Sequence, residues 1–259
     1  MTDLFRQTYG PTALVTGASS GIGLAFAEEL ARRGLDLILT ARRADRLKAL
    51  ADRLTAAHGV AVSVIGADLQ EPDAPARILQ RTGHADIGVL LSNAGFNIKG
   101  GFELQDPVRM AGMLTVNCHA PMQLAHGLLP HLKRRGKGGI VFTASVEGLI
   151  GCPYSAAYSA TKALVVALGE ALWGELQGTG VDVLTLCPGA TDTEATAGMK
   201  GLANLQSPND VARLALDNLR EGPTFVPHEH YRAMFQAIRA QPRREALAAM
   251  AESMKRMAR

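Results

Sequence analysis

Short runs of hydrophobic residues alternate with longer amphipathic segments along most of the chain. The short runs are mostly continuous, without strict alternation of apolar and polar residues, which is typical of strands buried on both faces. They predict strands at Thr12–Thr16, Leu35–Ala41, Val60–Gly66, Ile87–Ser92, Gly139–Ser145, Val181–Cys187 and, briefly, Thr224–Val226.

The segments between these strands carry the periodicity of helices that bury one face. They predict helices near Ile22–Arg33, Ala44–His58, Ala74–Thr82, Pro107–Arg135, Ala156–Gln177 and Pro208–Arg220. A repeated strand-helix order predicts an α/β fold, with a parallel sheet covered by helices on both faces. No linker, repeat or shift in composition divides the chain, so we expect one domain over residues 1–259.

Two predicted helical segments are apolar on more than one side. Tyr158–Glu175 carries Ala, Leu, Val and Trp173 on several stripes, and Met110–Leu132 is similar. A helix of this kind needs a second covering surface besides its own sheet. The pattern favours a homo-oligomer, either a homodimer or a homotetramer; the alternative is that both are central helices of the monomer.

Composition narrows the class of protein. The chain has 259 residues, 47% hydrophobic and 20% charged, which excludes a disordered chain. A net charge of +3 does not call for nucleic acid or an acidic membrane as a partner. No apolar run approaches the ~20 residues of a membrane span, and the first residues lack a signal-peptide pattern. The three cysteines, Cys118, Cys152 and Cys187, lie far apart, so we expect a cytoplasmic protein with no disulfide framework and no metal site.

A glycine-rich segment, Thr16-Gly17-Ala18-Ser19-Ser20-Gly21-Ile22-Gly23, directly follows the first predicted strand and opens a helix. Glycines let the main chain approach a pyrophosphate, and the free N–H groups of a helix start attract its charge. The glycine spacing differs from G-x-G-x-x-G, and a simple tight turn is the alternative. Its position in the first strand-helix unit favours a nucleotide.

The end of the second predicted strand bears on which nucleotide binds. It reads Leu39-Thr40-Ala41-Arg42-Arg43, without the carboxylate that would bind the ribose 2′-hydroxyl of NAD. An arginine at this place pairs well with a 2′-phosphate, so the sequence favours NADP(H) over NAD(H). A solvated pair of arginines is the alternative, and it is more plausible for Arg43 than for Arg42.

Tyr158 and Lys162 stand four residues apart and share one face of a predicted helix. A free tyrosine has a pKa of about 10, too high for efficient proton transfer at neutral pH. The ammonium group of Lys162 would lower the pKa of Tyr158. Ser145 ends a predicted parallel strand, where its hydroxyl could hydrogen-bond a substrate carbonyl. Without Ser145, Tyr158 and Lys162 would be read as a pair on a helix surface.

Taken in order, several motifs resemble the short-chain dehydrogenase/reductase family from about Gly10 to Val226. The resemblance rests on Thr16–Gly23, Ser92-Asn93-Ala94-Gly95, Asn117, Ser145, Tyr158 with Lys162, and Pro188-Gly189. It implies a Rossmann-type doubly wound fold, a seven-stranded parallel sheet in the order 3-2-1-4-5-6-7, and hydride transfer between a nicotinamide and a carbonyl or alcohol.

The resemblance also implies roles for single residues. Tyr158 would be the general acid in reduction and the base in oxidation, Lys162 would bind the cofactor ribose, and Ser145 would hold the substrate oxygen. Asn117 would keep a water in the proton relay. The cofactor would contact Gly17, Ser19, Ser20, Gly21, Ile22, Gly23, Arg42, Asp68, Leu69, Asn93, Ala94, Gly95, Tyr158, Lys162, Pro188, Gly189, Thr191 and Thr193. The substrate would contact Ser145, Glu147, Tyr154 and Tyr158.

By the same resemblance, the substrate pocket is mostly apolar and draws on Phe96–Ile98, Val146–Tyr154, Ala190–Thr191 and Met199–Leu205. A short lid is expected around residues 190–208. The basic segment Arg239–Arg259 reads as a helix that could cover the pocket, support an oligomer contact or project into solvent. These features favour an NADP-dependent oxidoreductase acting on a small-molecule substrate, a hydrophobic ketone or aldehyde or the matching alcohol. The alternatives are a reductase of 3-oxoacyl thioesters on an acyl-carrier protein and a non-catalytic NADP-binding sensor.

Overall fold

The computed structural model describes residues 2–83, 85–197 and 204–257. Its strands form one parallel sheet in the order β3-β2-β1-β4-β5-β6-β7, which confirms the predicted fold class and strand order. The strands are β1 (Thr12–Thr16), β2 (Asp36–Ala41), β3 (Val62–Gly66), β4 (Ile87–Ser92), β5 (Gly138–Thr143), β6 (Val181–Leu186) and β7 (Thr224–Phe225).

Helices connect the strands and extend the chain at both ends. The α-helices are α1 (Thr2–Tyr9), α2 (Gly21–Arg32), α3 (Ala44–His58), α4 (Ala74–Thr82), α5 (Pro107–Leu114), α6 (Ala120–Arg135), α7 (Ala156–Glu175), α8 (Pro208–Asp217), α9 (Glu229–Ala240) and α10 (Arg243–Met257). Short turns of 3₁₀-helix are η1 (Phe102–Leu104), η3 (Val146–Gly148) and η4 (Leu219–Glu221), and η2 (Thr115–His119) is a π-helical turn.

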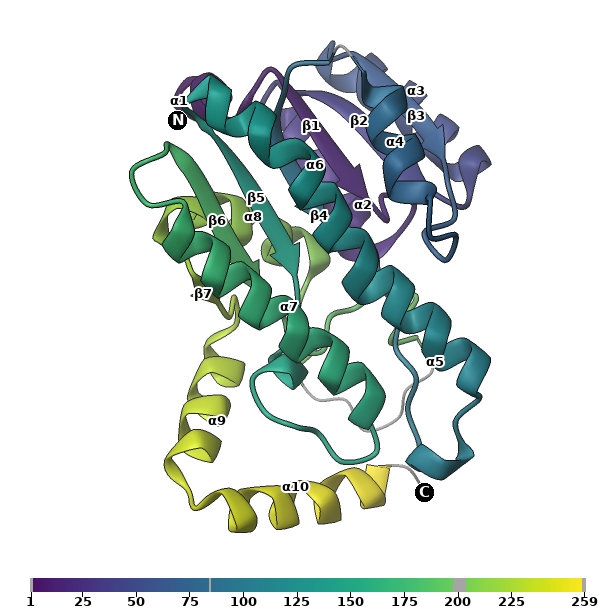
Figure 1. The fold of residues 1–259 in the computed structure, drawn as a ribbon, viewed down its shortest axis with the longest axis vertical. Coiled ribbons are helices and arrows are strands. Elements are labelled where there is room, and N and C mark those ends of the chain that lie inside the picture. Colours follow the sequence, from purple (N-terminus) through teal and green to yellow (C-terminus); the bar gives the residue numbers. More distant parts are fainter. Residues whose placement is uncertain (1, 84, 198–203, 258–259) are drawn as a thin grey trace.

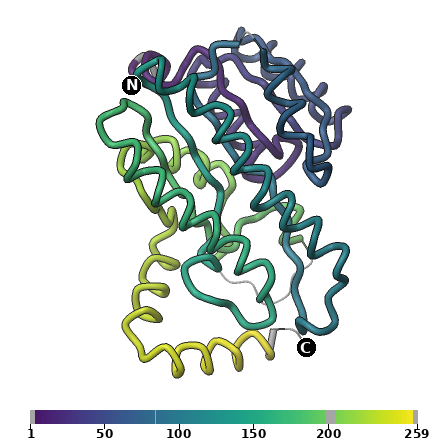
Figure 2. Tube along the Cα trace, viewed as in Figure 1, coloured from purple at the N-terminus to yellow at the C-terminus, as the bar shows by residue number. Residues whose placement is uncertain are grey.

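Helices cover both faces of the sheet (Figures 1 and 2), and each face carries its own apolar core. On one face α2, α3 and α8 contribute side chains such as Phe26, Leu47 and Val211. On the other face α4, α6 and α7 contribute side chains such as Leu124 and Val165. Helices cover the strands on both faces, which explains why the strand sequences are continuous apolar runs.

The single helix predicted over Pro107–Arg135 is wrong in one respect. The π-helical turn Thr115–His119 separates α5 from α6. Pro121 follows directly, and proline has no N–H to donate to the carbonyl of Asn117, against which its ring would also clash in a regular helix. Such a proline is a recognised cause of local widening.

The helix predicted over Arg239–Arg259 is confirmed for Arg243–Met257, which form α10, but Arg239 and Ala240 end a separate helix. Helix α9 already begins at Glu229, after the last strand, and ends at Ala240. Gln241 is extended, with φ −84° and ψ 155°, because the ring of Pro242 disfavours the helical conformation of the preceding residue. Helix α10 then begins at Arg243, and Figure 1 shows both helices beyond the carboxyl ends of the strands.

The segment predicted as a lid, residues 190–208, begins and ends in paired backbone. Thr191 forms a β-bridge with Gln206, whose N–H donates to the Ala190 carbonyl at 2.9 Å. The Asp192 N–H in turn donates to the Gln206 carbonyl, also at 2.9 Å. Residues 198–203, within this lid, lie outside the described residues.

Candidate active site

A cavity of about 1150 Å³ opens at the carboxyl ends of the strands and extends from the glycine-rich turn to α10. Nearly all the residues that the sequence assigned to cofactor or substrate line it. They are Gly17, Ser19, Ser20, Gly21, Ile22, Arg42, Asp68, Leu69, Asn93, Ala94, Gly95, Ser145, Glu147, Tyr154, Tyr158, Lys162, Pro188, Gly189, Thr191 and Thr193. Gly23 and Asn117 lie behind this lining.

The glycine-rich turn is shaped to admit a phosphate. Gly17 and Gly21 have φ values of +70° and +56°, which side-chain-bearing residues rarely adopt. A Cβ on Gly23 would lie 2.2 Å from the Gly17 carbonyl oxygen, so the close approach of turn and helix requires glycine there. Helix α2 starts at Gly21, and its N-cap residue Ser20 makes no side-chain capping bond. The first N–H groups of α2 are therefore not taken by the cap, and they fit an anionic group of a dinucleotide.

Arg43 lies directly on this turn. Its Nη2 donates to Ser20 Oγ at 2.7 Å and to Ser19 Oγ at 3.1 Å, and its Nη1 pairs with Glu194 at 2.8 Å. Arg42 also lines the cavity but is exposed. The reading of Arg43 as the more solvated of the two arginines is therefore wrong, and both arginines line the cavity near the glycine-rich turn.

The segment after β4 is held against the turn by Thr16. Its Oγ1 accepts hydrogen bonds from the backbone N–H groups of Asn93 at 2.9 Å and Ala94 at 3.0 Å. The Asn93 side chain returns a bond to the Thr16 carbonyl at 3.3 Å. This contact fixes two of the strand ends that form the floor of the cavity.

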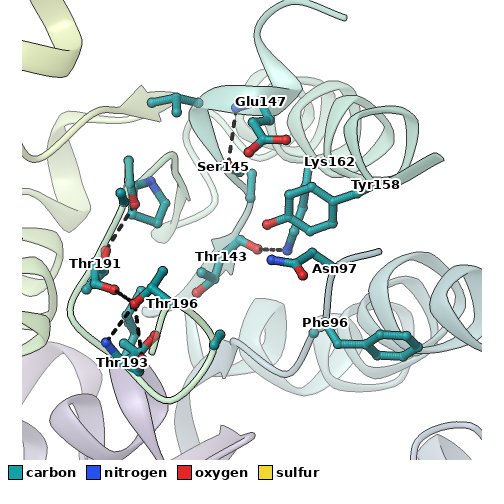
Figure 3. A pocket seen from close by; sticks show the side chains of 18 of the residues that line it. Phe96, Asn97, Thr143, Ser145, Glu147, Tyr158, Lys162, Thr191, Thr193 and Thr196 are labelled. Atoms are coloured by element: carbon teal, nitrogen blue, oxygen red, sulfur yellow. Dashed lines mark hydrogen bonds between the residues drawn. The ribbon is translucent and has the colours of Figure 1, made fainter. Parts of the chain in front are cut away.

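Ser145, Tyr158 and Lys162 face the cavity together (Figure 3). Ser145 caps η3, and its Oγ accepts the Glu147 N–H at 3.2 Å, while its hydroxyl also hydrogen-bonds the Tyr158 side chain. On α7, Lys162 Nζ donates to the Thr143 carbonyl at 2.7 Å and lies 5.6 Å from the centre of the Tyr158 ring.

Burial controls the proton affinity of this pair. It raises the pKa of Tyr158 above its ordinary value, and the charge of Glu147 raises it further, while a hydrogen bond from Ser145 acts in the opposite direction. Burial lowers the pKa of Lys162 to about 8. The predicted lowering of the pKa of Tyr158 by Lys162 is therefore not seen in this structure, where burial raises that pKa.

Asn117 lies in the π-helical turn, where its amide is fully engaged. Its Oδ1 accepts from the Phe96 N–H at 3.1 Å, and its Nδ2 donates to the Phe96 carbonyl at 2.9 Å and to Thr161 Oγ1 at 3.1 Å. The side chain ties the loop after β4 to α7. Its role in holding a relay water stays a prediction.

The far wall of the cavity is apolar and comes from the two C-terminal helices. Sequence reasoning left the place of this segment open and missed α9. The lining residues of these helices include Met234, Phe235, Ile238, Ala246, Met250 and Met254. Along α10 they recur at helical spacing, the signal by which they could have been found. Of the predicted pocket residues, 199–203 lie outside the described residues. Those described that do not line the cavity are Ile98, residues 148–151, Pro153 and Leu205.

Two further properties concern only the described part of the chain. No helix there is long and apolar enough to cross a membrane. No group of three or more His, Cys, Asp or Glu side chains there could hold a metal ion.

Dehydrogenases are among the known proteins that this chain resembles. The family model described as short chain dehydrogenase matches residues 11–201. A 7beta-hydroxysteroid dehydrogenase of Clostridium sardiniense is 31% identical, over 98% of this chain and 99% of its own length. A short-chain dehydrogenase from Sphingobium yanoikuyae, solved in complex with NADPH, superposes with a TM-score of 0.82 at 37% identity, covering 93% of this chain and 95% of the other. A bulky-bulky ketone specific alcohol dehydrogenase from Comamonas testosteroni gives 0.78 at 34% identity, covering 89% and 92%.

Proposed function

Because the chain belongs to the short-chain dehydrogenase/reductase family, and so is an oxidoreductase acting on alcohol or carbonyl groups, we propose that it uses NADP(H) to reduce bulky hydrophobic ketones. The observation that carries the proposal is the shared cavity. Ser145, Tyr158 and Lys162 face the same space as the apolar wall of α9 and α10. A substrate held against that wall would therefore meet a hydroxyl donor and a proton donor at its reacting end.

The roles of the three polar residues follow from their surroundings. Ser145, whose Oγ accepts the Glu147 N–H and whose hydroxyl hydrogen-bonds Tyr158 in this structure, would turn its proton to the substrate carbonyl oxygen. Tyr158, kept protonated by burial, donates its proton to that oxygen as the alcohol forms. Lys162, whose Nζ donates to the Thr143 carbonyl, would bind the ribose of the cofactor. Bound along the glycine-rich turn, the cofactor would supply the hydride.

Preference for NADP(H) is supported by the two arginines at the end of β2. Arg43 contacts Ser19 and Ser20, and Arg42 lies at the cavity wall. No carboxylate stands at the strand end to bind a 2′-hydroxyl. The relative from Sphingobium yanoikuyae, which was solved with NADPH, supports the same choice.

The size and lining of the cavity support a bulky substrate. The wall of Met234, Ile238 and Met250 offers apolar, adaptable surface in place of the many hydrogen bonds that a sugar would need. A hydroxysteroid dehydrogenase and a bulky-ketone alcohol dehydrogenase are among the relatives. We therefore expect polycyclic or otherwise bulky ketones to be better substrates than small polar ones.

The test is oxidation of NADPH and of NADH with a panel of ketosteroids, other bulky ketones, aldehydes and 3-oxoacyl thioesters. Turnover should be fastest with NADPH and a bulky ketone, and Tyr158→Phe should lower kcat by about 100-fold or more, because the proton donor is lost. Faster turnover of acyl thioesters would favour the acyl-carrier alternative. Tight NADPH binding without turnover of any compound would favour a sensor, and full activity of Tyr158→Phe would contradict the acid-base role.

We also propose that the enzyme is a homodimer or homotetramer. Leu114, Met122 and Leu164 are large apolar side chains on α5, α6 and α7 that are 52%, 43% and 38% exposed. A second copy of the chain would cover this surface. Sedimentation of the purified protein tests the proposal, and a monomer at micromolar concentration would contradict it.

A further inference from the structure

Glu147 is built into the catalytic centre through its backbone. It lies on η3, where its N–H donates to Ser145 Oγ at 3.2 Å. Its carbonyl accepts the hydroxyl of Ser159 on α7 at 2.6 Å. Glu147 is therefore fixed between the residue that would hold the substrate oxygen and the helix that carries Tyr158.

The two carboxylate oxygens of Glu147 have different surroundings. Oε1 pairs with Lys99 Nζ at 3.1 Å, and this ion pair joins η3 to the loop after β4. Oε2 is buried and has no hydrogen-bond partner. A buried carboxylate oxygen without a donor is costly, so its position calls for a functional explanation.

The negative charge of Glu147 acts on Tyr158. The titratable groups that act on the tyrosine from the elements packed around it are the Glu147 carboxylate and the thiols of Cys152 and Cys187. On its own helix, Lys162 directs its ammonium group to the Thr143 carbonyl. Figure 3 shows the Glu147 carboxylate beside the Tyr158 ring. Among the groups that act on Tyr158, Glu147 supplies the carboxylate, and its charge raises the pKa of the tyrosine.

We propose that Glu147 and Lys99 form a positioning pair for the catalytic tyrosine: the carboxylate adds to burial in keeping Tyr158 protonated, as reduction requires, and Lys99 partly offsets the effect of that carboxylate charge on the tyrosine. The inference rests on the proposed function, in which Tyr158 is the proton donor. A carboxylate beside a phenol opposes its ionisation, and a counter-ion on the carboxylate weakens that effect. Glu147 thereby favours reduction over oxidation at a given pH.

The test compares pH profiles of Glu147→Gln and Lys99→Met with the wild type, for reduction and for oxidation. Glu147→Gln keeps the shape of the side chain and should move the tyrosine midpoint in both profiles to lower pH by about one unit. Lys99→Met should move it to higher pH by about half a unit. The double variant should match Glu147→Gln, because Lys99 acts through the carboxylate. Glu103→Gln, on the exposed turn η1, is the matched control and should leave the midpoint in place.

A second measurement does not depend on turnover. The phenolate absorbance of each variant, taken as a difference from its Tyr158→Phe counterpart in the presence of NADP⁺, should show the same order of midpoints. If wild type and Glu147→Gln had the same midpoint and differed only in KM, the ion pair of Glu147 and Lys99 would have a structural role only. That result would overturn the inference. Loss of activity in Tyr158→Phe together with that result would leave the proposed function standing. Full activity of Tyr158→Phe would instead overturn the proposed function itself.

Discussion

At the scale of single residues, burial and one nearby carboxylate define the surroundings of Tyr158, the proposed proton donor. Ser145, Tyr158 and Lys162 were found because their order and spacing are legible in the sequence, and all three line one cavity. The state of Tyr158 depends on burial and on Glu147, which only the packing of η3 against α7 reveals. Arg43 was underrated for a similar reason, since its contacts with Ser19 and Ser20 join two separate loops.

The two arginines at the end of β2 give a prediction on cofactor choice. Arg42→Ala and Arg43→Ala should each weaken NADPH binding by about tenfold, because each loses a charge-assisted contact to the 2′-phosphate. NADH binding should change by less than about threefold, since NADH lacks that phosphate. Titration of cofactor fluorescence measures both dissociation constants.

Arg46→Ala is the control for this pair. Arg46 shares the partner Glu194 with Arg43 but does not line the cavity. It should leave the preference between the two cofactors unchanged. Equal losses of NADPH and NADH binding in Arg42→Ala and Arg43→Ala would show that neither arginine reads the phosphate.

At the scale of elements, the strands were predicted closely because each is a buried apolar run. The boundaries of the helices were predicted less well where a proline interrupts the helix just before it. Pro121 follows the π-helical turn that splits the predicted helix Pro107–Arg135, and Pro242 separates α9 from α10. Where α10 would pack could not be read from the sequence, because a basic helix rich in Ala and Met could cover the pocket, support an oligomer contact or project into solvent.

The wall formed by α10 gives a prediction on substrate binding. Met250→Glu places a charge in the apolar lining and should raise KM for bulky ketones by about tenfold or more. NADPH affinity should stay within about twofold, because the glycine-rich turn lies at the other end of the cavity. Steady-state kinetics and cofactor titration measure the two effects.

Ala248→Glu supplies the matched control. Ala248 is exposed on the same helix and lies outside the cavity lining, so the same charge there should change neither constant. Equal effects of the two substitutions would mean that α10 does not contact the substrate.

At the scale of the whole molecule, one buried lysine makes stability depend on pH. Lys162 is 4% exposed, and its pKa is lowered from 10.5 to about 8. Between these values the unfolded chain binds a proton that the native protein does not, so stability rises with pH across this window. The total rise from this group is on the order of 3 kcal/mol.

The raised pKa values of Cys152 and Cys187, both about 12, act in the opposite direction at high pH. The native thiols keep protons that the unfolded chain loses above a pH of about 9, which lowers stability there. The lysine effect is therefore isolated by comparing wild type with Lys162→Met by urea unfolding at several pH values. The stability of Lys162→Met relative to wild type should fall between pH 8 and 10.5. A difference that stays constant with pH would contradict the prediction.

The position of the C-terminal helices has a consequence for how this enzyme can diversify. The reacting groups and the cofactor turn lie between Gly17 and Thr193, whereas the apolar wall lies on α9 and α10, from Glu229 to Met257. Changes in the last two helices can reshape the range of accepted ketones while the chemistry is inherited unaltered. Recombination near residue 227 would then exchange the last two helices between homologues, and the range of substrates with them. Libraries aimed at new ketones should concentrate their mutations in α9 and α10.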